Sequence, residues 1–174
     1  PLPETDAALA LRQAAIADVE LYADACTTGS GVGLYAPGDF TAFVEFSLWR
    51  FVLTSSGTLT PNNINILEFT GAVLLAVVYI IVHQHKISAH PTPFHIHIWT
   101  DNMAAYWFIR RNRASYPVSI ILLQMLALLQ LRHRVIITIG HIPGQYNIYA
   151  DAISRWFRVP DGPALRRFLR PLPH

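Results

Sequence analysis

The stretch HIPGQYNIYADAISR, residues 141–155, is the most informative part of the sequence for the fold. It opens on a histidine in a turn that contains proline and glycine, and it continues into a short helical pattern that carries Asp151. Residues 135–140 (VIITIG), directly before it, have the β-branched composition of a buried strand. The stretch therefore predicts a strand, a turn and a helix that bears one acid.

Upstream of this stretch, short strands give way to apolar helices. Alternating patterns predict strands at residues 19–25, 31–37 and 40–49, joined by tight turns as in an antiparallel meander. Residues 66–85 predict a long, buried helix, for which Asn65 is a plausible N-cap with Glu68 at the capping-box spacing. The remaining predicted elements are a strand at residues 95–100 and helices at residues 102–113 and 118–133.

This order of elements predicts an α/β fold with a mixed five-stranded sheet, in which three antiparallel strands precede alternating helices and strands, with helices on both faces. The two internal helices, at residues 66–85 and 118–133, are apolar nearly all round, which favours burial between layers and is also typical of a domain that hides a face against a larger protein. We expect residues 1–17 to be an arm with a single helical turn, residues 18–158 to be the domain, and residues 159–174 to be a basic tail that contains prolines.

Composition excludes several classes of protein. The chain has 174 residues, of which 52% are hydrophobic and 14% charged, so it is neither intrinsically disordered nor collagen-like. The single cysteine, Cys26, excludes a disulfide scaffold and a cysteine-rich zinc module. The longest uninterrupted apolar run, residues 71–82, is shorter than a bilayer requires, and no secretory signal is visible, so we expect no membrane partner.

Acids are scarce in the central region, and their positions are informative. Four of them lie at strand ends or in helices within apolar surroundings, where a carboxylate is costly unless it is paired or binds a metal. Converging carboxylates without cysteine suit Mg²⁺ or Mn²⁺, and two such ions about 4 Å apart support phosphodiester hydrolysis. Singly, each acid also has a structural reading, such as a turn cap or an ion pair between Asp151 and Arg155. The six acids between residues 21 and 159 are Asp24, Asp39, Glu45, Glu68, Asp101 and Asp151.

Four blocks of the sequence resemble a ribonuclease H domain: LYADACTTGSGVGLY, NINILEFTGAVLL, IHIWTDNMAAYWFIRR and HIPGQYNIYADAISR. The order Asp24, Glu68, Asp101, Asp151 matches the family, and His141, Asn147 and Asp151 reproduce its H-x5-N-x3-D spacing. The phrases TDN and HIPG are most similar to retrotransposon reverse transcriptases, especially the tyrosine-recombinase (DIRS-like) group. The hepadnaviral polymerase ribonuclease H is the nearest rival.

The resemblance implies a ribonuclease H-like fold and a metal-dependent endonuclease that cleaves the RNA strand of RNA–DNA hybrids. The four acids would hold two Mg²⁺ or Mn²⁺ ions, and His141 would assist proton transfer or product release. The implied partners are the hybrid and the polymerase part of the same polyprotein, inside the cell. The residues implied to contact or place substrate are Ala25, Cys26, Gly29, Asn102 and Asn147.

Other constellations leave alternatives open. The histidines at positions 83, 85, 90, 95 and 97 have no known zinc spacing, and a polar rim is favoured over a metal site. Arg110, Arg111 and Arg113 suit a phosphate backbone and a solvated helix end equally well. The alternative function is a catalytically silent ribonuclease H-like structural or nucleic-acid-binding domain of a polymerase. Another nuclease or a transposase on the same fold is weaker, because integrase-like members lack a histidine block of this type.

Overall fold

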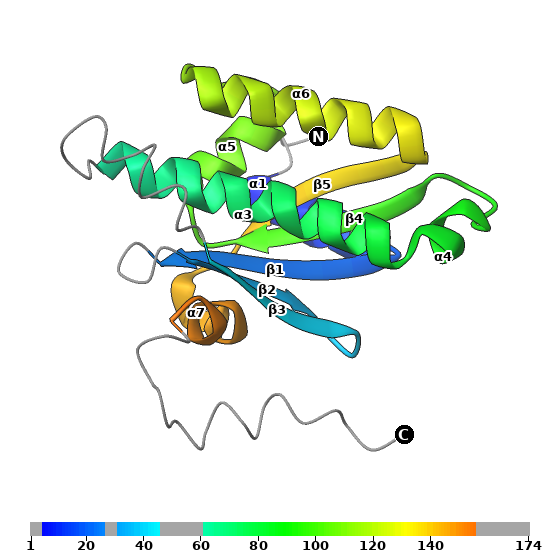
Figure 1. Cartoon of the computed structure of the whole chain (residues 1–174), viewed down its shortest axis with the longest axis horizontal. Coiled ribbons are helices and arrows are strands. Elements are labelled where there is room, and N and C mark those ends of the chain that lie inside the picture. The colour runs from blue at the N-terminus through cyan, green and yellow to red at the C-terminus, as the bar shows by residue number, and fades with distance from the viewer. Residues whose placement is uncertain (1–4, 27–30, 46–60, 156–174) are drawn as a thin grey trace.

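A computed structural model describes residues 5–26, 31–45 and 61–155, which form a sheet with helices on both sides (Figure 1). The sheet has five strands in the order β3-β2-β1-β4-β5. The first three pair antiparallel, whereas β4 is parallel to both β1 and β5. The predicted α/β fold with a mixed five-stranded sheet is therefore confirmed. The strands are β1 (Val19–Cys26), β2 (Gly31–Ala36), β3 (Phe40–Glu45), β4 (Phe94–Thr100) and β5 (Val135–His141).

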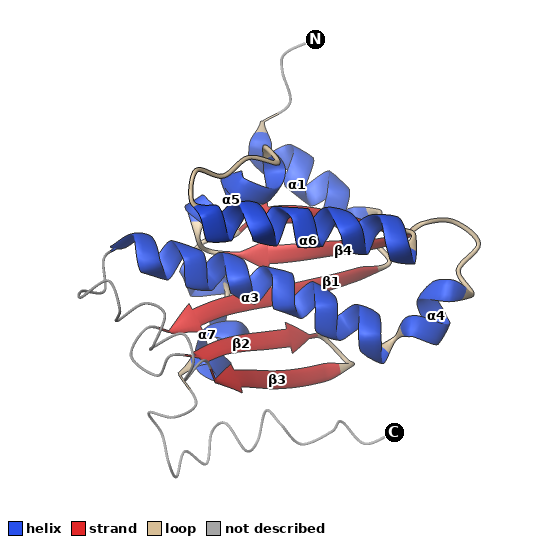
Figure 2. Ribbon diagram, turned by 45° about the horizontal axis from the view of Figure 1, so that its top comes forward, coloured by secondary structure: helices blue, strands red, loops and turns tan. Residues whose placement is uncertain are grey.

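Both faces of the sheet are covered (Figure 2). One face carries the larger core, in which α3 packs against α5, α6 and the apolar side chains of alternate strand residues. The other face carries α1 over β5 and α7 over β1 and β2. The helices are α1 (Asp6–Ala15), α3 (Pro61–Val82), α4 (Gln84–Ser88), α5 (Met103–Arg110), α6 (Pro117–His133) and α7 (Ile148–Ser154), and a single 3₁₀ turn, η1, spans Gly144–Tyr146.

Helix α3 runs through the middle of the core. Its segment Ile64–Val82 is long and apolar enough to cross a bilayer, yet 61% of that window is buried inside the fold, as in the core helix of a folded domain. The predicted start of this helix is wrong. Helix α3 begins at Pro61, so Asn65 lies inside the helix and does not cap it. Proline at the first helical position has the fixed φ that a helix start needs.

The N-terminal segment is more ordered than the single turn expected of an arm. Helix α1 spans ten residues and is capped by Thr5, whose hydroxyl accepts the amide N–H of Ala8 at 3.2 Å. Ala10 and Ala14 pack against the buried Trp99 ring on the sheet. The small side chains let α1 lie close to the strands and complete the second face of the fold.

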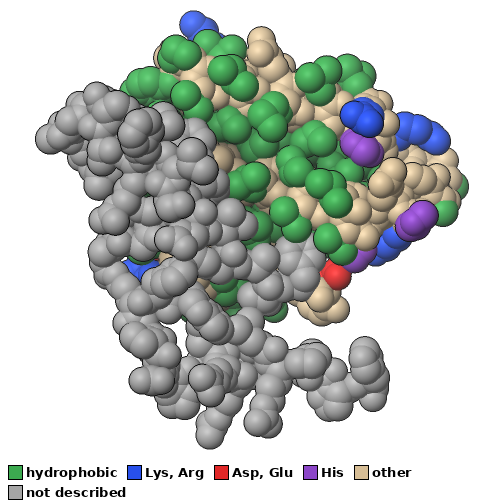
Figure 3. All heavy atoms as spheres, viewed as in Figure 1, with side chains coloured by type: hydrophobic (Ala, Val, Ile, Leu, Met, Phe, Trp, Pro, Cys, Tyr) green, Lys and Arg blue, Asp and Glu red, His purple; other side chains and the backbone are tan. Residues whose placement is uncertain are grey.

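Helix α6 is apolar on its outer face as well as on its buried face. The side chains of Ile121, Leu128 and Leu131 are 56%, 65% and 80% exposed. Hydrophobic side chains gather over α3 and α6 on the side of the molecule drawn in Figure 3. A surface helix ordinarily turns polar residues to water, so this outer face departs from the usual pattern.

The histidines of β4 are joined through a hydroxyl. His95 Nε2 and His97 Nδ1 both lie within hydrogen-bond distance of Thr138 Oγ on β5, at 2.7 and 2.8 Å. Burial lowers the pKa of His97 to about 4, so this ring is neutral at physiological pH. These contacts give both histidines a polar role within the sheet.

We expect replacement of Thr138 by valine to lower the free energy of unfolding by about 2–4 kcal/mol, because it leaves two buried imidazoles without their shared partner. Denaturant unfolding monitored by circular dichroism measures the change. Thr138→Ser, which keeps the hydroxyl, serves as the control and should lose only the contribution of one methyl group. Equal losses in the two variants would contradict a role for the hydroxyl.

Candidate active site

Three carboxylates from distant parts of the chain meet at one edge of the sheet. Asp24 lies near the end of β1, and Asp101 directly follows β4, which is parallel to β1. Because neighbouring parallel strands end at the same edge, these two side chains are brought together. Glu68 reaches the same point from α3, which packs on β1. One ligand oxygen from each of Asp24, Glu68 and Asp101 lies within 4.8 Å of the others.

The electrostatics of this cluster favour a cation. Asp24 and Glu68 are only 5% and 6% exposed. Burial raises the pKa of Asp24 to about 7. The hydrogen bond from Ser154 lowers this pKa, whereas the negative charges of Asp101 and Asp151 raise it further. Burial, together with the charge of Asp24, raises the pKa of Glu68 well above its usual range. Negative charges that repel one another in a buried place are stabilised by a metal ion between them.

Helix α7 holds Asp24 through a serine. The Ser154 hydroxyl donates to Asp24 Oδ2, and this contact requires α7 to lie almost on the backbone of β2. Gly33, which pairs with Asp24 across the strands, makes the approach possible. A Cβ at Gly33 would lie 2.3 Å from the Ala150 carbonyl oxygen and 2.6 Å from the Ser154 nitrogen. Sequence reasoning missed Ser154, although its place three residues after Asp151 puts both on one helix face.

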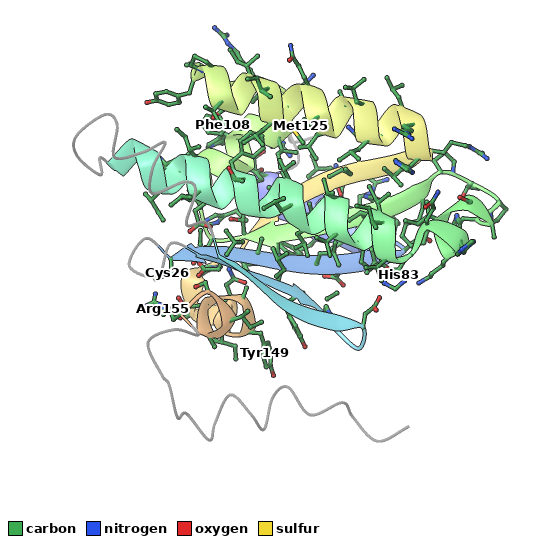
Figure 4. All side chains as sticks on the ribbon, viewed as in Figure 1. Cys26, His83, Phe108, Met125, Tyr149 and Arg155 are labelled. Carbon is green, nitrogen blue, oxygen red and sulfur yellow. The ribbon has the colours of Figure 1, made fainter. Side chains whose placement is uncertain are left out.

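Asp151 lies beside the three-carboxylate cluster and is engaged by a cation. Arg155 Nε donates to Asp151 Oδ1 at 2.7 Å, and Arg155 Nη2 lies 2.6 Å from the same oxygen. The predicted i,i+4 ion pair is therefore formed. Asp151 is close enough for its charge to raise the pKa of Asp24 and Glu68. Figure 4 shows Arg155 on α7 next to the end of β1, where Cys26 is labelled.

The loop after β5 lies over Asp101. His141 Nε2 is 3.2 Å from the Asp101 carbonyl oxygen, and the ring is only partly buried. A Cβ at Gly144 would lie 3.0 Å from Asp101 Oδ2, so glycine lets the loop pass close to the carboxylate. The predicted histidine therefore stands at the rim of the cluster and is partly exposed to solvent.

The side chains expected to contact substrate are mostly occupied within the fold. Asn147 is 1% exposed, and its amide donates to the Ala23 carbonyl oxygen at 3.1 Å, which ties the loop to β1. Its side chain thus places the loop and does not face a substrate. Asn102 caps α5, because its Oδ1 accepts the Ala105 N–H at 2.9 Å.

The first strand contributes less open surface than expected. The backbone N–H of Ala25 donates to Glu68 Oε2 at 3.1 Å, so this amide orients a carboxylate of the cluster. Cys26 is buried. Gly29 lies outside the described residues. Ala25 therefore supports the cluster through its backbone amide.

Comparisons with known proteins address the fold. No known protein-family profile matches the sequence, and no curated protein matches it. Among solved structures, ribonuclease H1 from the halophilic archaeon Halobacterium salinarum NRC-1 is similar, with a TM-score of 0.53 and 16% identity over 78% of this chain and 92% of that one. LC11-RNase H1, solved in complex with an RNA/DNA hybrid, has a TM-score of 0.54 and 12% identity over 78% and 93% of the two chains. The chain therefore has a ribonuclease H-like fold.

Proposed function

We propose that the chain is a metal-dependent endonuclease that hydrolyses the RNA strand of RNA–DNA hybrids. The convergence of Asp24, Glu68 and Asp101, with Asp151 and His141 at their rim, carries this proposal. The similar LC11-RNase H1 is seen with an RNA/DNA hybrid, and the order of the four acids along this chain resembles that family. Fold and acid arrangement therefore support the same reaction.

The residues present fit divalent ions. The donor set of the cluster consists of carboxylate oxygens, which are hard ligands that suit Mg²⁺ and Mn²⁺. Asp24, Glu68 and Asp101 would hold one ion, and Asp151 with Asp24 would hold a second. Bound there, the ions supply positive charge that lowers the pKa of an attacking water and stabilises the leaving oxygen.

The chain's own groups orient these ligands and move protons. The Ser154 hydroxyl fixes the Asp24 carboxylate, and the Ala25 amide fixes Glu68. His141, on the rim, is placed to exchange a proton with the departing 3′-oxygen or with water, because an imidazole ring can both donate and accept a proton. Gly144, in the turn after His141, lets this loop pass close to the Asp101 carboxylate.

The end of α5 offers contacts to a nucleic-acid backbone. Arg110 is engaged in the fold, since its Nη2 lies 2.5 Å from Asp6 Oδ1 on α1. Arg111 and Arg113 are exposed, and the Arg111 guanidinium lies 4.1 Å from the centre of the Trp107 ring. Stacking on an aromatic ring restricts the guanidinium while its N–H groups remain able to bind phosphate oxygens. These two arginines are our candidates for phosphate binding.

We expect the Arg111→Ala and Arg113→Ala substitutions each to weaken hybrid binding about 3- to 10-fold and to reduce the slope of log K against log salt by about 1. Fluorescence anisotropy at several salt concentrations gives both quantities. Arg12→Ala, which removes one exposed charge from α1, serves as the control. An unchanged salt slope in all variants would exclude contact between these arginines and phosphate.

The biological setting is a separate part of the proposal. The TDN and HIPG phrases resemble retrotransposon reverse transcriptases, so we propose that the domain acts with a polymerase in the same polyprotein and degrades the RNA template inside the cell. Sequencing the reading frame on both sides of the coding segment tests this setting. A flanking polymerase domain supports it, and a frame without one contradicts it.

The decisive experiment for the activity uses a labelled RNA–DNA hybrid with Mg²⁺ or Mn²⁺. The wild-type chain should cleave the RNA strand alone and leave 3′-hydroxyl and 5′-phosphate ends, and Asp101→Asn should not. Asp39→Asn, which changes a carboxylate on the β2–β3 turn, provides a control that should retain activity. Binding of the hybrid without cleavage in either metal would instead support the catalytically silent alternative.

A further inference from the structure

Arg155 is the one cation that forms an ion pair with a carboxylate of the candidate active site within the described part of the chain. Its Nε donates to Asp151 Oδ1, and its Nη2 lies 2.6 Å from the same oxygen. The two residues are separated by one helical turn of α7, so the pair forms without any rearrangement of the fold. The oxygen that would bind a second metal ion therefore already has a positive partner.

The four acids of the candidate active site differ in whether a cationic side chain is bonded to them. Asp24, Glu68 and Asp101 gather their oxygens within 4.8 Å and have no cationic side chain bonded to them among the described residues. Asp151 lies outside that group. Its side chain is 37% exposed, and the Arg155 side chain is 52% exposed. An ion pair this open to water is weak and exchanges readily. Arg155 thus holds Asp151 loosely, by a contact that a stronger cation can displace.

From this arrangement we propose that Arg155 competes with the second divalent ion for Asp151, so that the two ions bind in sequence with different affinities. The inference rests on the proposed function, and it concerns the order of metal binding. The first ion occupies the three-carboxylate cluster without disturbing Arg155. The second binds only when Arg155 leaves Asp151, and the released guanidinium then faces the same rim of the site as the substrate phosphates.

Titration of the metal-free chain with Mn²⁺, followed by calorimetry and by electron paramagnetic resonance of unbound Mn²⁺, tests the order of binding without any substrate. The wild-type chain should bind one ion tightly and a second one weakly. Arg155→Gln should tighten the second step about 5- to 10-fold and leave the first within about 2-fold, because it removes both the competing ion pair and a positive charge near the ion. Arg155→Lys should lie between the two.

Two further variants separate competition from a general change of charge. Arg111→Gln removes one positive charge on α5, at the Trp107 ring, and should leave both steps unchanged. In the Asp151→Asn background, Arg155→Gln should no longer affect the second step, since the negative charge for which the two cations compete is gone. An equal effect of Arg111→Gln and Arg155→Gln, or an effect that persists without Asp151, would overturn the inference.

Failure of the inference is distinguishable from failure of the proposed function. If the first ion binds and the hybrid is cleaved, but the affinity for the second ion is the same in wild type and in Arg155→Gln, only the proposed competition is wrong. If no ion binds to the cluster at all, the metal-dependent activity itself is contradicted, and Arg155 then has only a structural role.

Discussion

Replacing Asp24 by asparagine is expected to abolish hybrid cleavage, by at least about 1,000-fold, and at the same time to stabilise the metal-free protein above pH 7. The first effect follows because Asp24 is shared by both proposed ion positions and stabilises charge in the reaction. The second follows because this carboxylate is buried among other carboxylates, so that its ionised form is costly in the fold. Asparagine keeps an oxygen that accepts the Ser154 hydroxyl but carries no charge.

The sign of the pH dependence follows from the raised pKa of Asp24. Its value is about 7 in the fold, whereas a solvated aspartate titrates near 3.9. Between these values the folded chain binds more protons than the unfolded chain, so stability falls as pH rises and the cost is complete above pH 7. Asp24→Asn removes this cost, on the order of 4 kcal/mol for a shift of about three pKa units, which corresponds to a rise in Tm of about 8–16 °C at pH 8.

Thermal unfolding in the presence of a chelator, at pH 5 and at pH 8, measures the effect. The difference between Asp24→Asn and wild type should be small at pH 5 and large at pH 8. Asp39→Asn removes a carboxylate of the β2–β3 turn that lies 2.7 Å from His83 Nε2, so this control should show no gain in Tm at pH 8. A variant that is destabilised equally at both pH values would show that Asp24 serves the fold, and the metal-site interpretation of its burial would be wrong.

Replacing Gly33 by alanine is expected to lower the free energy of unfolding by about 3 kcal/mol and cleavage by about 100-fold. The added Cβ would clash with two backbone atoms of α7, namely the Ala150 oxygen and the Ser154 nitrogen. Backbone atoms cannot relieve such a clash by a change of rotamer, as a flexible side chain can. Helix α7 must therefore shift away from β2. That shift moves Ser154 and Asp151 away from Asp24, although neither side chain has been changed.

Gly38→Asn is a suitable control for this substitution. Gly38 lies in the β2–β3 turn with φ +71°, and a Cβ there would meet nothing within 4 Å. Asparagine tolerates a left-handed backbone better than other residues with a side chain, so this variant should remain close to wild type in Tm and cleavage. If Gly33→Ala unfolds at the wild-type temperature and cleaves normally, α7 does not position the site by close packing.

The acids of the cluster were predictable because each follows a local pattern. Asp24 lies near the end of one strand and Asp101 directly follows another, and strand ends are visible as the end of an apolar alternation. The support of Asp24 by Ser154 and Gly33 was not predictable in the same way. These residues are adjacent to Asp24 only in space, and a glycine within a strand pattern does not name the helix that approaches it.

Two local predictions failed or stayed open for physical reasons. Asn65 and Glu68 have the spacing of a capping box, but Asn65 does not cap α3 because the helix already begins at Pro61. The Asn65 side-chain oxygen instead accepts a hydrogen bond from the side-chain amide of Asn102 at 3.0 Å. The β4 histidines offered a metal or a polar interpretation. Both histidines lie within hydrogen-bond distance of Thr138, which is more than 40 positions away in the sequence. The spacing of residues within β4 could not have identified this partner.

The outer face of α6 has a consequence for work with the protein in solution. Each of its large exposed side chains would contribute about 1.5–3 kcal/mol if it were removed from water, so two such faces attract each other when the protein is concentrated. Hydrophobic attraction weakens on cooling. We therefore expect light scattering from concentrated samples to fall on chilling and to return on warming, and cold, dilute solutions to be the conditions in which the active site is best studied.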